Sequence, residues 1–235
     1  MQKLLLFLIA LLFCSQSIMA QFNEKPVLNI ENKDKKFLNY GYYLGLNRFG
    51  FKFNYKDNLG DKNTDIQVLK STGFDVGLIG EMRMNEFLDI RVEPGLAYTA
   101  RTLGFPGFTE ERDAIREVKS TYINFPLLLK INTRRIGNWK PFIVGGGSAS
   151  LNLGSNEDSL DDNASGTFRM TKWVYSYELG FGIDFYLEYF KFTPSIRGIF
   201  ALTDELVPDQ DPNSPWTSNI EGMRSRGIFI NLTFE

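Results

Sequence analysis

Most of this chain alternates between apolar and polar residues with a period of two. In the segment 72–84, Phe74, Val76 and Leu78 occupy alternate positions, and charged residues such as Asp75 fall on the other phase. The same alternation recurs in four more segments, at 88–101, 121–132, 173–185 and 190–200. Because successive side chains of a β-strand point to opposite faces, each segment predicts a strand with one apolar and one polar face.

Three less regular segments complete a set of eight strands. Residues 40–55 change phase near Asn47, which predicts a β-bulge. Residues 140–153 contain the run GGGSAS at 145–150. This run lacks the Lys and the helix start of a phosphate-binding loop, so we interpret its glycines as allowing close strand packing and curvature. Residues 227–235 alternate to the end of the sequence.

The gaps between these strands alternate in length. Long gaps, near 56–70, 103–118, 154–170 and 204–221, alternate with short ones at 85–87, 134–138 and 187–189. All long connections then lie at one end of an up-and-down sheet, as in outer-membrane barrels with long external loops and short periplasmic turns. The predicted fold is all-β, an eight-stranded antiparallel up-and-down transmembrane β-barrel.

The charged residues of the five regular strands indicate which face points inward. All twelve fall on the polar phase: Asp75, Glu81, Arg83, Asp89, Arg91, Glu93, Arg101, Lys130, Glu178, Asp184, Lys191 and Arg197. A Lys or Arg that faces lipid at mid-bilayer costs about 2–4 kcal/mol, so these side chains should point into the lumen. An eight-stranded barrel is filled by its own side chains, which favours a packed ionic core over a wide pore.

A soluble, lipocalin-like barrel with the two faces reversed is an alternative interpretation. The aromatic residues near strand ends favour the membrane barrel, because they are typical of an interface girdle: Tyr40, Tyr42, Tyr98, Trp173, Tyr175, Tyr186 and Tyr189. The apolar phase also carries more bulk than a small lumen holds. Phe234 resembles the C-terminal signal that barrel-insertion machinery recognises, displaced by one residue because Glu235 follows.

The first twenty residues have the pattern of an export signal. Lys3 precedes an apolar run at 4–13, and Ala20 ends the segment, which predicts a signal peptide over 1–20. The single cysteine, Cys14, lies inside it. Residues 21–39 show no strand pattern and are expected to form an N-terminal periplasmic segment. The outer-membrane β-barrel domain is then expected over 40–235.

Composition excludes much catalytic chemistry. The 235 residues include no His, so no Ser-His-Asp triad or His-ligated zinc site can form. With 26 basic and 28 acidic residues, the net charge of −2 gives no sign of a nucleic-acid partner. We expect no enzyme activity, no catalytic residue, no cofactor, no metal and no small-molecule substrate. Carboxylates such as Asp89 and Glu93 are expected to form structural ion pairs in the lumen.

Two acidic loops contain the oxygen ligands that calcium prefers. The first carries Glu157, Asp158, Asp161 and Asp162. The second has the D-x-D-x-N spacing at Asp209, Asp211 and Asn213, but Ser214 and Ile220 stand where an EF-hand has its Gly and Glu. We interpret both as solvated loops at the cell surface.

The segment 109–120, TEERDAIREVKS, carries acidic residues behind a possible capping residue, Thr109. This order predicts a short helix. The helix is either a loop decoration or a docking surface.

The sequence resembles the PorT (SprT) proteins of Bacteroidetes over nearly all of the expected mature chain. The similarity is carried by TGFDVGLIGEMRMNEFLDIRVEPGLAYTAR, FPGFTEERDAIREVKSTYINFPLLLK, SNEDSLDDNASGTFRMTKW, YELGFGIDFYLEYFKFTPSIRGIFALTDEL and DPNSPWTSNIEGMRSRGIFINLTFE. The pattern Y-x-x-x-P-L-L-x-K, from Tyr122 to Lys130, is shared with a wider superfamily of small outer-membrane barrels. The loop strings FPGFTEERDA, SNEDSLDDNASGTFRM and DPNSPWTSNIEGM are more specific, because barrel architecture does not require them.

This resemblance implies a non-enzymatic component of the type IX protein secretion system, which exports cargo across the outer membrane and supports gliding motility. It implies outer-membrane lipid and other secretion components as partners, and it supplies no catalytic residues. A small porin-like or surface outer-membrane protein is the alternative. In either case we expect function in the external loops, near 110–119, 156–170 and 209–223, or in the N-terminal segment.

Overall fold

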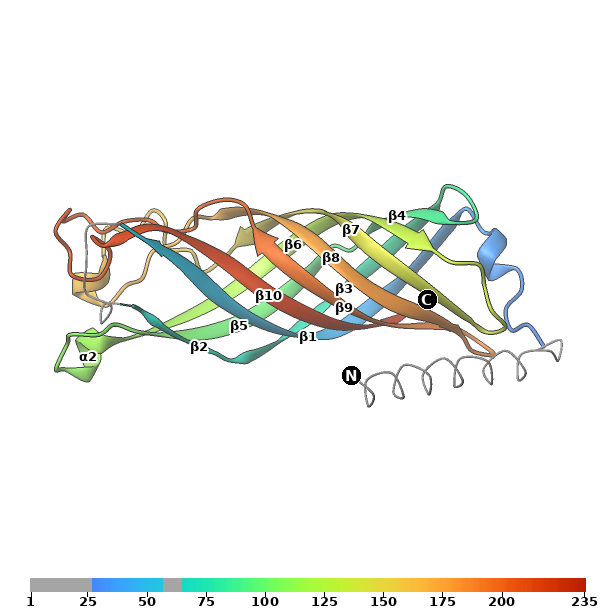
Figure 1. Ribbon diagram of the computed structural model, residues 1–235, viewed down its shortest axis with the longest axis horizontal. Helices are drawn as coiled ribbons and strands as arrows, with labels where there is room; N and C mark the ends of the chain where they lie inside the picture. The colour runs from blue at the N-terminus through green and yellow to red at the C-terminus, as the bar shows by residue number, and fades with distance from the viewer. Residues whose placement is uncertain (1–26, 57–64) are drawn as a thin grey trace, which may run out of the picture.

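The computed structural model describes residues 27–56 and 65–235, which form one antiparallel barrel (Figure 1). The strands are β1 (Leu38–Tyr55), β2 (Gln67–Lys70), β3 (Thr72–Arg83), β4 (Leu88–Val92), β5 (Gly95–Gly104), β6 (Ile115–Asn132), β7 (Trp139–Asn152), β8 (Trp173–Tyr186), β9 (Lys191–Ala201) and β10 (Ile220–Phe234). Each strand pairs antiparallel with its neighbours, and β1 pairs with both β3 and β10, which closes the sheet. The predicted signal peptide over 1–20 lies outside the described residues.

The sheet contains ten strands, but β2 and β3 lie end to end in one position of the wall, and so do β4 and β5. The barrel therefore has the eight wall positions that were predicted. Ser71 separates β2 from β3, and Glu93 and Pro94 separate β4 from β5. Pro94 has no N–H to donate to the ladder. Its carbonyl accepts a hydrogen bond from the backbone N–H of Leu78 at 2.9 Å. Strand β2 lies within the predicted gap 56–70, and β1 begins at Leu38, two residues before the predicted start of the barrel.

The connections alternate in length as predicted. The short turns 84–87, 133–138 and 187–190 lie at one end of the barrel, here called the turn end, together with the 3-10 helix η1 (Lys33–Lys35). The opposite end, here called the loop end, carries α2 (Glu111–Ala114) and η3 (Asn163–Ser165) in its long connections (Figure 1). Over residues 27–56 and 65–235, no helix is long and apolar enough to cross a membrane.

The helix predicted over 109–120 is confirmed for a single turn only. Its N-cap residue is Glu110 and not Thr109, and no side chain caps it. From Ile115 onward the chain is strand β6, whose residues Arg116 and Val118 alternate into the barrel. The period-two pattern of this segment therefore overrides its local helix signal.

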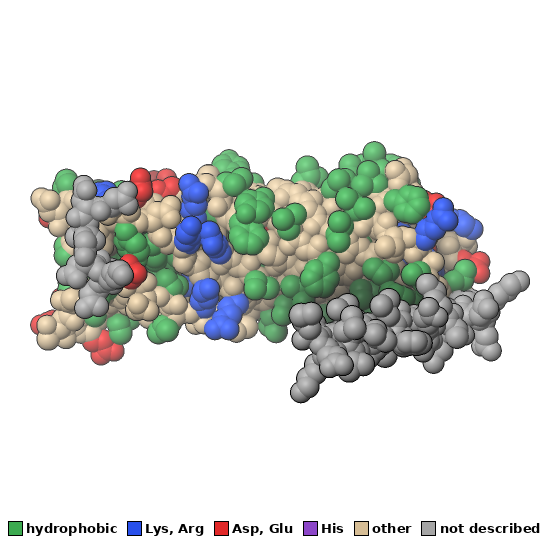
Figure 2. Space-filling model, in the orientation of Figure 1, with side chains coloured by type: hydrophobic (Ala, Val, Ile, Leu, Met, Phe, Trp, Pro, Cys, Tyr) green, Lys and Arg blue, Asp and Glu red, His purple; other side chains and the backbone are tan. Residues whose placement is uncertain are grey.

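Exposed apolar side chains form a belt on the outer wall between the turn end and a group of basic residues nearer the loop end, and Figure 2 shows one face of it. Its exposed side chains include Leu44 and Leu46 on β1, Val76 and Leu78 on β3, Leu127 and Leu129 on β6, Leu179 and Phe181 on β8, and Ile228 and Ile230 on β10. Six of the seven predicted girdle residues lie on the outer surface, but Tyr186 does not. Its side chain is 2% exposed inside the barrel, because residue 186 continues the inward phase of Asp184.

Toward the loop end the two faces exchange character. On β1, Leu46 and Arg48 point outward, whereas Phe49 and Phe51 point inward. The strand pairing is continuous through this region, so the bulge predicted near Asn47 is wrong. The single shift of register on β1 lies at Asn54 and Tyr55. What changes near Asn47 is the composition of each face, because the wall beyond this point lies outside the apolar belt.

Inside the loop end, the inward apolar side chains pack into one cluster. Phe51, Leu103, Val118, Met170 and Met223 belong to it, and each is at most 9% exposed. Similar close packing occurs along β7, where a Cβ on Gly146 would lie 2.1 Å from the carbonyl oxygen of Leu127. Within the GGGSAS run, Gly146 therefore allows close strand packing, as predicted, whereas Gly147 has no neighbour closer than 3.8 Å to such a Cβ.

Candidate functional site

A network of ion pairs fills the lumen in the part of the barrel nearest the turn end. Lys130 pairs with Glu81 at 3.0 Å and with Asp184 at 2.8 Å. Lys191 pairs with Glu81 at 3.1 Å, so Glu81 joins both lysines. Arg91 extends the network, since it lies 3.3 Å from Glu81. These side chains are at most 4% exposed, so the charges neutralise one another away from bulk water.

A second set of ion pairs continues the network toward the loop end of the lumen. Arg91 contacts Glu93 at 2.5 Å, and Arg197 contacts the same carboxylate at 2.6 Å. Arg197 also reaches Glu178, at 3.3 Å. Within the described residues, Arg197 is the only cation in an ion pair with Glu178. Glu178 therefore depends on this one guanidinium for its charge balance.

The side chain of Glu235 closes the network at the turn end. Its carboxylate lies 2.6 Å from Lys191 Nζ and 3.8 Å from Arg91, and the side chain is fully buried. Backbone hydrogen bonds between Glu235 and Lys191, in both directions, fix it beside β9. Phe234, which precedes it, faces outward and packs against Tyr42 with ring centroids 5.3 Å apart.

Two carboxylates of the lumen are held by amides rather than by cations. Asp75 accepts a hydrogen bond from Asn47 Nδ2 at 2.6 Å. Asp89 accepts one from Asn132 Nδ2 at 2.5 Å. Of the expected pair Asp89 and Glu93, only Glu93 forms ion pairs among the described residues.

Above the ionic network, Arg101 lies in an aromatic layer. Its guanidinium is 4.1 Å from the ring centroid of Phe51 and donates to the Tyr122 hydroxyl at 3.0 Å. It also donates to Ser225 Oγ at 3.2 Å, and Ser225 donates in turn to Glu205 at 2.9 Å. Burial raises the pKa of Glu205. This layer joins the ionic core to the apolar cluster of the loop end, since Phe51 belongs to that cluster.

Among the described residues, the side chains of the lumen leave little room for solute. Two interior cavities, one beside Glu81 and Asp184 and one beside Phe49 and Tyr122, measure about 20 Å³ each. A cavity of that size holds about one water molecule. The geometry describes a filled barrel rather than an open channel.

Three of the long connections pack together over the outer mouth, and we call this assembly the loop cap, residues 105–114, 153–172 and 202–219. Trp216 links two of them, because its indole N–H donates to the carbonyl of Asp113 at 2.9 Å and its ring stacks on Phe108. Asn163 links the connection 153–172 to 202–219 through Asp209 Oδ1 at 2.9 Å, and to strand β6 through its own carbonyl, which accepts from Arg116 at 2.8 Å. All three of the specific loop strings contribute to this cap.

The acidic side chains of the loop cap bind loop atoms. Asp209 accepts from Thr217 Oγ1 at 3.0 Å, in addition to Asn163. Asp162 accepts from the N–H of Ala164 at 3.0 Å, and Glu157 accepts from that of Lys172 at 2.7 Å. Within residues 27–56 and 65–235, no three acidic groups gather in the manner of a metal site. The carboxylates act here as loop and cap stabilisers.

At the turn end, the N-terminal segment lies across the inner mouth. Asp34 lies 3.0 Å from the guanidinium of Arg135 and accepts from the Tyr186 hydroxyl at 2.5 Å. Asn29 donates two hydrogen bonds, from its backbone N–H to Asn138 Oδ1 at 2.9 Å and from its side-chain amide to the carbonyl of Tyr186 at 3.0 Å. We call residues 27–36 the inner plug. This part of the expected periplasmic segment is docked on the barrel.

The inward positions of the charged residues are largely those predicted. Eleven of the twelve are at most 6% exposed, and Arg83 is half-buried at the rim, where it donates to the carbonyl of Asp34. Sequence reasoning missed Asp34, Glu205 and Glu235. The alternation of β10 carries a signal for Glu235, since it shares the inward phase of Thr233. Asp34 and Glu205 lie outside the strands, where no periodicity marks them.

A closed antiparallel barrel with an apolar belt outside and paired charges inside defines a transmembrane β-barrel of the outer-membrane type. Consistent with this class, the family model described as "Outer membrane protein beta-barrel domain" matches residues 19–207. The match spans most of the chain, and the protein belongs to this outer-membrane β-barrel family. The fold prediction is thereby confirmed. The family match carries nothing specific to PorT proteins or to type IX secretion.

Several solved outer-membrane proteins are similar to this chain in structure. OprG from Pseudomonas aeruginosa aligns over 83% of this chain and 94% of its own, with 13% identity and a TM-score of 0.48. Neisserial surface protein A aligns over 82% and 95%, with 11% identity and a TM-score of 0.41. The Yersinia pestis protein Ail aligns over 83% and 96%, with 12% identity and a TM-score of 0.36. No curated protein matches the sequence.

Proposed function

We propose that this protein is a non-enzymatic surface protein of the outer membrane, which acts through its exposed surfaces and not by conducting solute. The observation that carries this proposal is the filled lumen. Ion pairs occupy the part of the lumen nearest the turn end, and the aromatic layer and the apolar cluster occupy the part nearest the loop end. A molecule crossing the barrel would have to displace both the inner plug and these buried side chains.

The loop cap is the surface best suited to recognise a partner. Its connections are held in one arrangement by Trp216, Asn163 and Asp209, so it presents a defined shape rather than separate mobile loops. Loops carried on a rigid scaffold are common sites of recognition.

A finer proposal is that the partners are components of the type IX secretion system. It is supported by the resemblance of the loop strings to PorT proteins, together with the position of those strings. Barrel architecture does not require FPGFTEERDA, SNEDSLDDNASGTFRM or DPNSPWTSNIEGM, and all three contribute to one cap. On this proposal the barrel is held by outer-membrane lipid, and the cap or the inner plug contacts the export machinery.

Planar-bilayer recording tests the first proposal. The purified full chain should give no large, stable open channel. A stable conductance of that kind would refute the filled-lumen argument and would favour a porin.

A null strain tests the secretion proposal. Loss of the protein should retain C-terminally tagged cargo in the cell and stop surface spreading. Restoring the Trp216→Ala variant should reproduce the defect while the barrel still inserts, because the indole connects two loops of the cap. Restoring Leu160→Ala is the matched control, since Leu160 is 87% exposed in the same cap. Normal export in the null strain would refute the secretion role and leave the surface-protein proposal standing.

A further inference from the structure

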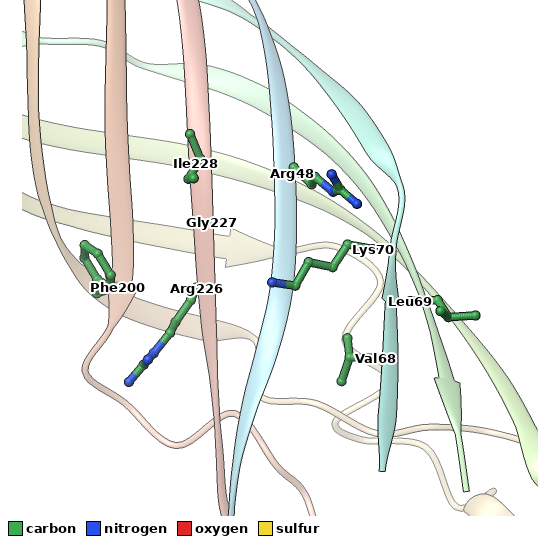
Figure 3. A pocket seen from close by; sticks show the side chains of 8 residues that line it. All are labelled: Arg48, Val68, Leu69, Lys70, Phe200, Arg226, Gly227 and Ile228. Atoms are coloured by element: carbon green, nitrogen blue, oxygen red, sulfur yellow. The ribbon is translucent and has the colours of Figure 1, made fainter.

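A groove of about 720 Å³ crosses the outer wall near the loop end (Figure 3). It lies where β2, which precedes β3 in the chain, separates from β1. The pairing between β1 and β3 ends at Arg48 and Thr72. Strand β2 then pairs with β5, and no ladder joins β1 to β2 in the described part of the chain. The wall therefore has a seam at this height.

Three cations from three strands line the groove. They are Arg48 of β1, Lys70 of β2 and Arg226 of β10, and all three side chains are exposed. Within residues 27–56 and 65–235, none of them forms an ion pair. Two more exposed cations, Lys52 and Arg224, face each other across β1 and β10 one step nearer the loop end. The groove thus carries a concentrated positive charge.

A glycine sets the position of the central cation. A Cβ on Gly50 would lie 2.2 Å from Cε of Lys70. Because Gly50 has no side chain, Lys70 extends across β1 toward β10, as Figure 3 shows. The Lys70 side chain therefore lies across β1 at Gly50, two residues from Arg48 and opposite Arg226 in the ladder between β1 and β10.

The apolar belt begins directly beside these cations, on their turn-end side. Leu46 and Ile228 are each 55% exposed and lie next to Arg48 along β1 and β10. Phe200, which also lines the groove, stacks on Tyr177 with ring centroids 5.0 Å apart. Since long loops mark the external side of such barrels, this border lies at the outer leaflet of the membrane.

We propose that this groove binds a phosphate-bearing lipid of the outer leaflet. Its headgroup phosphate would be held by Arg48, Lys70 and Arg226, and its acyl chains would lie on Leu46 and Ile228. Arginine and lysine at the edge of an apolar belt complement both parts of such a molecule. This site is independent of the secretion proposal, because it requires only insertion in the outer membrane.

Native mass spectrometry of the full chain, folded in detergent, tests the site with diphosphoryl lipid A as the probe. The wild-type protein should retain this lipid in preference to the same lipid with its phosphates removed. The triple variant Arg48→Gln, Lys70→Gln and Arg226→Gln should bind it more weakly, by about tenfold to a hundredfold. Inorganic pyrophosphate should compete poorly, because it lacks the acyl chains.

Two further variants make the test specific. The control triple Arg112→Gln, Lys119→Gln and Lys172→Gln removes the same charge from exposed positions elsewhere at the loop end and should bind like wild type. Gly50→Ala keeps every charge but displaces Lys70, and should weaken binding. Equal loss in the two triples, equal retention of the dephosphorylated lipid, or full competition by pyrophosphate would overturn the proposal. Heat-dependent migration in SDS verifies that each variant is folded.

Discussion

Replacing Arg197 with methionine probes the ionic core at its most dependent contact. The substitution keeps an unbranched side chain but removes the cation that pairs with Glu93 and Glu178. Glu93 keeps a second partner in Arg91, 2.5 Å away. Glu178 loses its ion pair and stays buried, with a side chain 3% exposed. The main effect should therefore come from one uncompensated carboxylate.

The size of this effect follows from the burial of the pair. Removing one partner of a buried ion pair costs about 3–5 kcal/mol, because the other charge stays away from water. With a urea dependence of about 2 kcal/mol per molar, the unfolding midpoint should fall by about 1.5–2.5 M. An exposed pair is worth about 0–1 kcal/mol, so Arg134→Met should shift the midpoint by at most about 0.5 M. Arg134 pairs with Glu86 at 3.6 Å on the surface.

Urea titration of the protein in lipid vesicles measures these midpoints, with folded and unfolded forms separated by their migration in SDS. The double variant Arg197→Met with Glu178→Gln should recover more than half of the loss, because it removes the unpaired charge. A midpoint for Arg197→Met equal to that of wild type would refute the reasoning. It would mean that water solvates Glu178 and that the lumen is hydrated.

Three further predictions address the wall, the strand packing and the inner plug. The folded protein should migrate differently in SDS before and after boiling, and identical migration would contradict a closed barrel. Gly146→Ala should destabilise the barrel by about 1–3 kcal/mol in urea titration, because its Cβ would meet the Leu127 carbonyl at 2.1 Å. Gly147→Ala should be nearly neutral, since its closest neighbour would be 3.8 Å away, and equal effects would refute the packing argument. Asp34→Ala should speed tryptic cleavage within the inner plug relative to Glu31→Ala, an exposed control, and equal cleavage rates would mean that Asp34 does not hold it.

The barrel and its ionic core could be predicted because both depend on a period of two. A charged residue facing the membrane is costly, so the phase of Glu81 or Lys130 already indicates that it lies inside. The same reasoning misplaced Tyr186, because an aromatic residue is acceptable on either face and only the strand's phase decides. It also produced the bulge at Asn47, since it assumed that the apolar face is the outer face along the whole strand.

The loop cap and the inner plug could not be predicted from periodicity. Asp34, Asn163 and Trp216 act through contacts with residues far away in the sequence, and nothing local indicates their partners. The sequence marked the loop strings as unusual without showing that they meet. Their packing gives them a structural role in closing the outer mouth, whether or not they also bind a secretion component.

The exchange of faces near Asn47 also determines how deep the protein sits. A uniform apolar wall could slide along the membrane normal with little penalty, but this wall changes from Leu46 to Arg48 within one outward step. Sinking would bring Arg48 and Arg226 into hydrocarbon, and rising would expose Leu46 and Ile228 to water. The barrel therefore has one preferred depth, and the loop cap is held at a constant height above the lipid surface. A partner that recognises the cap would find it at the same distance from the membrane in every copy.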